Sequence, residues 1–215
     1  SRSLPEMSKN LLLISLGPVQ SMIAQAKRTR DLWMGSFLIS EISKAAAKAL
    51  SDMNAELIFP ALDKGCKELM PSEDPVTAAN VANKIVARIE GDGKPYAQAA
   101  REAAKNRLKE WGLKVLRENS ELVEPGIDKT ALEQLDSLLE YWAVWAPLDK
   151  NYDKVRTDLE SELQARKYLC PFQPWQHQRE DLFKSSLDGA RQSILKRCEY
   201  RTGDAWKQYR IGMRE

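Results

Sequence analysis

The chain has 215 residues, 43% hydrophobic and 30% charged, a composition that excludes an intrinsically disordered or collagen-like protein. Its 33 basic and 31 acidic side chains leave a formal net charge of +2, so any nucleic-acid surface needs a local concentration of cations. The three cysteines are far apart in the sequence, which disfavours a zinc site or a disulfide framework and favours a reducing, cytoplasmic location.

The first half of the chain is predicted to combine strands with one long helix. The apolar run 10–16 ends at Gly-Pro and is typical of a buried strand, since it is far too short to cross a membrane. Helical spacing then predicts a helix from Pro18 to about Met53, with a kink or a close contact at Gly35, because a mid-helix glycine costs about 1 kcal/mol. Further strands are expected over 55–60 and 83–90, with a loop over 61–79 and a turn over 91–93.

The second half is predicted to be mainly helical. Helices are expected over 95–122 and from 128 to about 140, because Pro125-Gly126 interrupts the helical pattern between them. The aromatic and branched run 141–147 predicts a fourth strand. Two more helices are expected over 149–168 and 185–200, with a loop over 169–178 between them.

The element order is strand, helix, two strands, helices and strand, which is the ferredoxin-like βαββαβ plan of an α+β protein. We therefore expect residues 7–148 to form one palm-like domain with long helices, and 149–215 to form a helical C-terminal extension or linker. Residues 1–6 are interpreted as an added linker, since Met7 suits a natural start. RNA-binding modules, polymerases and cyclases all use this plan, so the fold does not select among them.

One segment combines features suited to phosphate binding. The first strand ends at Gly17-Pro18, a helix opens there, and three cations follow, Lys27, Arg28 and Arg30. Backbone amides at a helix start attract anions, and neighbouring cations add to that attraction. In the alternative interpretation the cations are only the solvated face of an amphipathic helix, paired locally with Asp31.

The same segment resembles a known family motif. Residues 17–36 read Gly-Pro-Val-Gln-Ser-Met-Ile-Ala-Gln-Ala-Lys-Arg-Thr-Arg-Asp-Leu-Trp-Met-Gly-Ser. This run is similar to a segment of the large, polymerase/cyclase-like subunit of type III-B CRISPR (Cmr) effector complexes, with Met22 in place of the usual aromatic residue. Weaker likenesses occur in 57–60, 82–85 and 142–167, so the resemblance covers roughly residues 10–175.

The resemblance implies the first palm domain of a protein that normally has two. Such proteins sense target RNA, bind crRNA-complex subunits and convert ATP to cyclic oligoadenylates through a Gly-Gly-Asp-Asp motif in the second palm, and many carry an HD nuclease domain. For this chain it implies a composite ATP site, a second palm and other effector subunits as partners, indirect contact with crRNA and target RNA, and a possible homodimer of the isolated domain. The implied ATP-facing residues are Gly17, Pro18, Gln20, Arg28, Arg30, Gly35 and Ser36.

Catalytic palms hold two metal ions with carboxylates at the end of the first strand and in the central hairpin. Here the first strand ends Ile-Ser-Leu-Gly and no Gly-Gly-Asp-Asp occurs, so this palm is predicted to be non-catalytic, with Mg²⁺ or Mn²⁺ held by another domain. One histidine, His177, cannot form an HD site. The alternatives are a stand-alone nucleotidyl cyclase-like enzyme and a generic RNA-binding ferredoxin-like module. Trp33, Trp142 and Trp145 are expected in the core.

Overall fold

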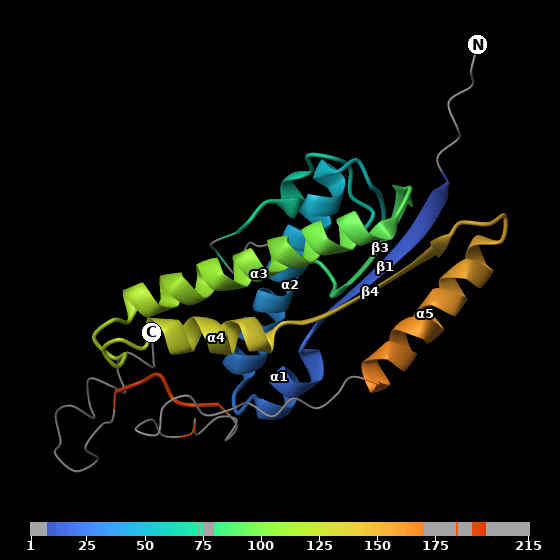
Figure 1. Ribbon diagram of the computed structural model, residues 1–215. Coiled ribbons are helices and arrows are strands. Elements are labelled where there is room, and N and C mark those ends of the chain that lie inside the picture. Colours follow the sequence, from blue (N-terminus) through green and yellow to red (C-terminus); the bar gives the residue numbers. More distant parts are fainter. Residues whose placement is uncertain (1–7, 73, 75–79, 170–183, 185–190, 197–215) are drawn as a thin grey trace. The chain divides into compact units, whose positions relative to one another are not determined.

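The chain forms two compact units in the computed structural model, which describes residues 8–72, 74, 80–169, 184 and 191–196 (Figure 1). The first unit comprises 1–108 and 136–173, and the second comprises 109–135 and 174–215. Across the described residues, no helix has both the length and the apolar character that crossing a membrane requires.

The first unit is built on a four-stranded sheet in the order β2-β3-β1-β4, in which all neighbours are antiparallel. The central strand β1 pairs with β3 on one side and with β4 on the other. This order is the one expected of a βαββαβ chain and confirms the predicted ferredoxin-like α+β class. The strands are β1 (Lys9–Gly17), β2 (Glu56–Phe59), β3 (Lys84–Glu90) and β4 (Glu140–Pro147).

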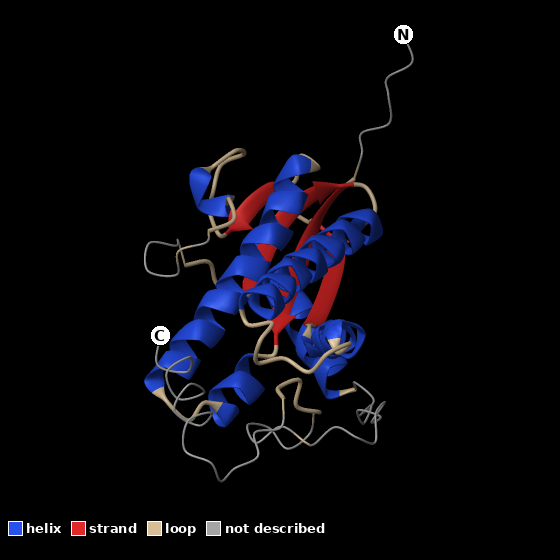
Figure 2. Ribbon diagram, turned by 90° about the vertical axis from the view of Figure 1, so that its left-hand side faces the viewer, coloured by secondary structure: helices blue, strands red, loops and turns tan. Residues whose placement is uncertain are grey.

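Helices cover both faces of this sheet (Figures 1 and 2). Helix α5 (Tyr152–Tyr168) packs on β4 and β1, and α2 (Thr29–Asp52) packs on β1 and β3 from the other face. Every side chain from 11 to 16 is therefore at most 2% exposed. Burial on both faces explains why β1 is one continuous apolar run instead of an alternating one.

Helix α5 belongs to the first unit and is not an appendage to it. Leu159 and Leu163 of α5 join Leu11, Leu13 and Val86 in one buried cluster. The units consequently do not divide at the boundary expected between 148 and 149. The apolar side chains on this face of the sheet are buried by α5, the helix that directly follows β4.

An asparagine caps the start of α5. The side chain of Asn151 accepts a hydrogen bond from the Lys154 backbone N–H at 3.1 Å. We expect Asn151→Ala to lower the free energy of unfolding by about 1 kcal/mol, because this N–H then loses its partner. Urea denaturation checks this, with the exposed neighbour Lys150→Ala as control. Equal losses in the two variants would contradict the capping role.

The helix predicted over 18–53 is in fact two helices, α1 (Val19–Gln25) and α2. The break at residues 26–28 follows from Asp31, whose carboxylate accepts hydrogen bonds from the backbone N–H groups of Lys27 at 3.1 Å and Arg28 at 2.9 Å. An acidic side chain in the first turn that bonds back in this way fixes a helix start. Asp31 therefore sets the start of α2 and separates it from α1. This is a capping role, whereas the sequence suggested only an ion pair with the neighbouring cations.

Helix α2 continues through Gly35. The close contact expected at that position is present. A Cβ added at Gly35 would lie 3.1 Å from the Met22 methyl group. Glycine therefore allows α1 to pack closely against α2.

Helix α3 (Gly93–Glu118) spans the two units, since the first unit ends at Leu108. In the first unit, the Tyr141 hydroxyl of β4 donates to the Ala97 carbonyl of α3 at 2.7 Å. This bond lies on the α2 side of the sheet, because Tyr141 is opposite Leu16 in the β1–β4 register and alternates with the residues that face α5.

The second unit joins the end of α3 to α4 (Asp128–Leu138), with Gly126 at φ 72° in the connection. Residues 191–196 are extended here: the backbone N–H of Glu124 donates to the Ile194 carbonyl at 3.0 Å. The helix predicted over 185–200 is therefore wrong at 191–196, and its remainder lies outside the described residues. Ile194 instead packs against the small core formed by Leu116, Val123, Ile127 and Ala131.

Candidate functional site

A pocket of about 290 Å³ lies between α1, the start of α2 and the segment 80–83 that leads into β3. Its walls are mainly apolar, and include Met22 and Ile23 of α1 and Leu32 of α2. The polar groups that line it are the side chains of Asp31, Ser36, Asn80 and Asn83.

Hydrogen bonds fix the 80–83 wall of this pocket. The side-chain amide of Asn83 donates to the Leu16 carbonyl at 3.0 Å, and the Leu16 N–H donates to the Asn83 carbonyl at 2.8 Å. The Val81 N–H donates to the Ser40 hydroxyl of α2 at 2.8 Å. The wall is thus held by the end of β1 on one side and by α2 on the other.

A buried ion cluster further along α2 anchors the connection that carries this wall. One carboxylate oxygen of Glu41 accepts from the Arg107 guanidinium of α3, at 2.6 Å from Nη2, and from the Ser72 N–H at 3.1 Å. Its other oxygen pairs with Lys44. Sequence reasoning missed this cluster, although Glu41 and Lys44 at i,i+3 spacing in an apolar stretch were a usable signal.

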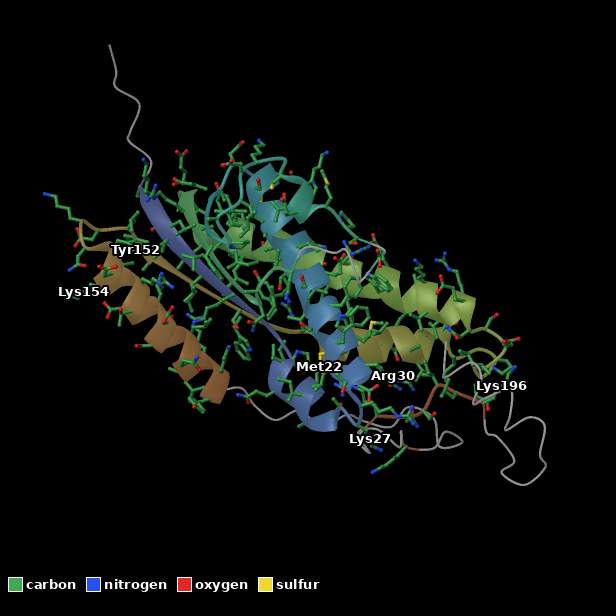
Figure 3. All side chains as sticks on the ribbon, turned by 180° about the vertical axis from the view of Figure 1, so that it is seen from behind. Met22, Lys27, Arg30, Tyr152, Lys154 and Lys196 are labelled. Carbon is green, nitrogen blue, oxygen red and sulfur yellow. The ribbon has the colours of Figure 1, made fainter. Side chains whose placement is uncertain are left out.

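Two of the predicted ligand-facing residues, Gly35 and Ser36, line the pocket. Gly35 is buried against Met22, whereas Ser36 is exposed. In Figure 3, Met22 is on the side of α1 that faces α2. The C-terminal end of the 17–36 segment, Gly35-Ser36, therefore lies in the wall of the pocket.

The predicted cations lie outside the pocket lining. Lys27 and Arg28 are exposed in the link between α1 and α2, and Arg30 is exposed in the first turn of α2. Figure 3 labels Lys27 and Arg30. The Arg30 guanidinium is 4.0 Å from the Asp31 carboxylate. Gln20 is exposed on α1 and does not line the pocket either.

Gly17 and Pro18 are buried at the end of β1. Gly17 pairs with Glu140 of β4, and a Cβ at Gly17 would lie 2.8 Å from a Glu140 carboxylate oxygen. Helix α1, which follows Pro18, has only seven residues. A carboxylate therefore stands beside the turn that was predicted to face phosphate.

Four exposed apolar side chains on α1 and the first turns of α2, here called the rim patch, belong to the pocket lining or are next to it in the sequence. Trp33 is 46% exposed, so the prediction of a core position for it is wrong. Ile23, Leu32 and Met34 complete the rim patch at 59%, 44% and 47% exposure, and two of them also line the pocket. Trp142, by contrast, packs on the core as predicted.

The α5 face of the sheet carries a polar group at the end of β1. The Lys167 ammonium of α5 donates to the Ser15 hydroxyl at 2.8 Å, and Lys84 is opposite Ser15 in the β1–β3 register. Burial lowers the pKa of Lys167, the Lys84 ammonium lowers it further, and the Glu140 carboxylate raises it. Because Lys84 and Lys167 are cations and offer only donors, this group does not fit Mg²⁺ or Mn²⁺. Within the described ranges, no three His, Cys, Asp or Glu side chains form a group that could hold a metal ion.

Comparisons with known proteins agree on one family. Residues 11–115 match the family described as CRISPR-associated protein Cmr2, N-terminal. The CRISPR system Cmr subunit Cmr2 of Pyrococcus furiosus is 29% identical over 163 residues, which cover 66% of this chain. The chain spans only 18% of the length of that relative.

One solved structure adds a shared fold. The cryo-EM structure of the Type III-B Cmr-beta bound to cognate target RNA matches with a TM-score of 0.51 at 14% identity, over 88% of this chain and 28% of the other. The apo Csm1-Csm4 cassette matches with a TM-score of 0.40 at 15% identity, over 78% and 19%. The family match and the Pyrococcus relative together support a Cmr2-like large subunit of a type III-B CRISPR system, in which residues 11–115 correspond to the Cmr2 N-terminal segment.

Proposed function

We propose that this chain forms one wall of an ATP-binding cleft in a type III-B CRISPR effector complex, and that a second palm domain completes the cleft and synthesises cyclic oligoadenylate there. The pocket beside Gly35 and Ser36 carries this proposal, because most of its lining belongs to the segment 17–36 that resembles the Cmr motif. Its volume of about 290 Å³ is at the lower limit of the roughly 300–1,000 Å³ typical of small-molecule sites, which suits a base better than a whole nucleotide.

The pocket lining suits adenine. Apolar side chains such as Met22 and Leu32 offer contact for the flat faces of the base. The Ser36 hydroxyl and the Asn80 amide can both donate and accept hydrogen bonds, as the edge of adenine requires. An apolar pocket with a few polar groups at its margin is the usual form of a cofactor site.

The rim patch favours a cleft that is completed by a second protein domain, and not one formed by this chain alone. Ile23 and Leu32 expose apolar surface at the pocket, Trp33 and Met34 expose more on the same stretch of α2, and exposed apolar surface favours docking of another protein. We propose the second palm as that partner, with the exposed Arg28 and Arg30 available to its acidic groups. Other effector subunits would dock elsewhere on the chain, and contact with crRNA and target RNA would be indirect.

Catalysis is assigned to the second palm. The β1 end of this chain presents Ser15, Lys84 and one carboxylate, that of Glu140, whereas two-metal chemistry requires several carboxylates. We therefore propose that this chain, in the cytoplasm, binds and orients ATP, whereas the metal ions are held across the cleft.

Blocking the pocket tests the proposal. We expect Ser36→Trp to abolish ATP binding and oligoadenylate synthesis in the assembled complex, because the indole would occupy the space of the base. Ser36→Ala should weaken binding less, since it removes one hydrogen bond. Ser161→Trp, at an exposed serine of α5, is the control. Unchanged ATP affinity in Ser36→Trp would refute the assignment of the base to this pocket.

A further inference from the structure

Strand β4 is an edge strand, because within the described residues β1 is its only strand neighbour. In an antiparallel pair, residues that hydrogen-bond to the partner strand alternate with residues whose backbone N–H and C=O groups point away from it. The Leu148 N–H donates to the Lys9 carbonyl at 2.9 Å, which assigns the even-numbered residues of β4 to the set bonded to β1. The backbone groups of Tyr141, Ala143 and Trp145 therefore point outward, away from the sheet.

A groove of about 470 Å³ lies along this outer edge. Its lining includes Tyr141, Ala143 and Trp145, the three residues with outward backbone groups, and all of it belongs to the first unit. The walls come from the first half of α3 and from the end of α5, and Figure 1 shows β4 between these two helices. The open stretch 141–145 has the length of a typical strand.

The groove is positively charged. Its lining contains the cations Lys94 and Arg101 of α3 and Arg166 of α5, and no carboxylate. Arg166 is paired with Glu162 at 2.7 Å. Lys94 and Arg101, in contrast, have no ion-pair partner within the part of the chain that the structure describes. An occupant with acidic side chains would therefore complement the α3 wall.

The two unpaired cations are near opposite ends of the open stretch. A Cβ added at Gly93 would overlap the Trp145 ring, so Lys94, the next residue, is near the Trp145 end. Burial raises the pKa of Tyr141 and the Arg101 guanidinium lowers it, which puts Arg101 near the Tyr141 end. At about 1.5 Å per helical residue, the two cations are roughly 10 Å apart along α3, close to three residues of a strand.

The α5 wall of the groove is more apolar than the α3 wall. Trp142 is on the α5 face of β4 and packs partly on the core there. Leu169, directly after α5, is 80% exposed. Successive side chains of a strand point to opposite faces, so a strand added at this edge would present alternate residues to the two walls.

We propose that the outer edge of β4 binds an extended segment of another polypeptide, which adds to the sheet as a fifth strand with acidic side chains toward α3 and apolar side chains toward α5. Main-chain hydrogen bonds to β4 would supply affinity, and the alternating side chains would supply specificity. The groove shares no lining residue with the pocket beside Ser36, so this inference does not depend on ATP binding.

Two other occupants fit less well. Single-stranded RNA would suit the cations, but it has no regular row of donors and acceptors to match the outward backbone groups of β4. A second copy of this chain could pair edge to edge, but the cations that line its groove would then approach the same cations of the first copy.

A blocked, fluorescently labelled peptide, Glu-Val-Glu-Val-Glu-Val-Glu, tests the proposal by fluorescence anisotropy with the 215-residue chain. We expect saturable binding, and none by the analogue with lysine in place of glutamate. Lys94→Glu and Arg101→Glu should each weaken the affinity about tenfold, because they replace an attraction with a repulsion. Lys154→Glu, at an exposed lysine of α5 outside the groove (Figure 3), is the control and should bind as the native chain does.

Removing backbone donors tests strand addition separately from charge. N-methylation of the glutamate amides or of the valine amides, whichever set faces β4, should abolish binding, and methylation of the other set should not. In the chain, Ala143→Pro removes one outward N–H and no bond to β1, a position at which edge strands tolerate proline. This variant should lose the peptide while its thermal unfolding remains close to native.

Several results would overturn the inference. They are the absence of peptide binding, binding that survives both methylations, and native affinity in both glutamate variants. Oligouridylate that binds in place of the peptide and is lost in the same variants would assign the groove to RNA. A dimer in sedimentation velocity that Ala143→Pro dissociates would assign it to a second copy. If Ala143→Pro does not fold, the methylated peptides still decide whether a strand is added.

Discussion

Glu41→Gln is expected to lower the free energy of unfolding by about 3–5 kcal/mol, the range for removing one partner of a buried ion pair. The substitution preserves the shape of the side chain but removes the carboxylate charge that Lys44 and Arg107 share. The Lys44 side chain is 2% exposed and that of Arg107 is 12% exposed, so water cannot replace the lost charge. Urea denaturation followed by circular dichroism measures the loss.

Asp52→Asn is the matched control on the same helix. Asp52 pairs with Lys48 at 2.6 Å, but the two side chains are 59% and 37% exposed. Exposed pairs contribute about 0.2–1 kcal/mol, so this variant should remain close to the native protein. Similar losses in both variants would mean that burial does not govern the Glu41 cluster.

Glu41→Gln should also affect the pocket from a distance. Glu41 binds the Ser72 N–H, and Arg107 donates to the Ser72 carbonyl at 3.0 Å. Both contacts tie the connection between β2 and β3 to the helices. We therefore expect faster hydrogen exchange at the Val81 and Asn83 amides in the variant, at temperatures where the sheet remains folded.

Leu163→Ala is expected to lower the free energy of unfolding by about 2–5 kcal/mol. Leu163 is 1% exposed and packs with Leu13 and Val144 under α5. The exposed neighbour Gln164→Ala should be nearly neutral. The comparison tests whether α5 is integral to the palm, because an independent extension would tolerate the loss of Leu163 with little change in the unfolding of the sheet.

The strands were predictable because their signals are local. The buried run of β1 and the aromatic run of β4 each match the observed strand to within a residue at either end. The break between α1 and α2 was not predictable from hydrophobic spacing, because spacing continues across it. It depends on the Asp31 carboxylate bonding to backbone N–H groups, which competes with helix continuation.

The candidate site was predictable only in part. Gly35 and Ser36 were found through a motif, and they line the pocket. Asn80 and Asn83 were not identified as site residues, since their place depends on pairing with the end of β1. Trp33 shows why residue type alone does not predict burial. An aromatic residue on a helix is usually buried, but among the described residues no element packs over Trp33.

The pairing of β1 with β4 affects how the chain folds while it is being synthesised. Leu11 is opposite Ala146, so the first strand emerges from the ribosome well over a hundred residues before its partner. At about 5–20 residues per second, this delay is on the order of 10 s. During that time six consecutive, otherwise buried side chains have β3 and α2 as cover but no β4 or α5. We therefore expect the yield of the folded protein to depend on chaperones that recognise short apolar segments.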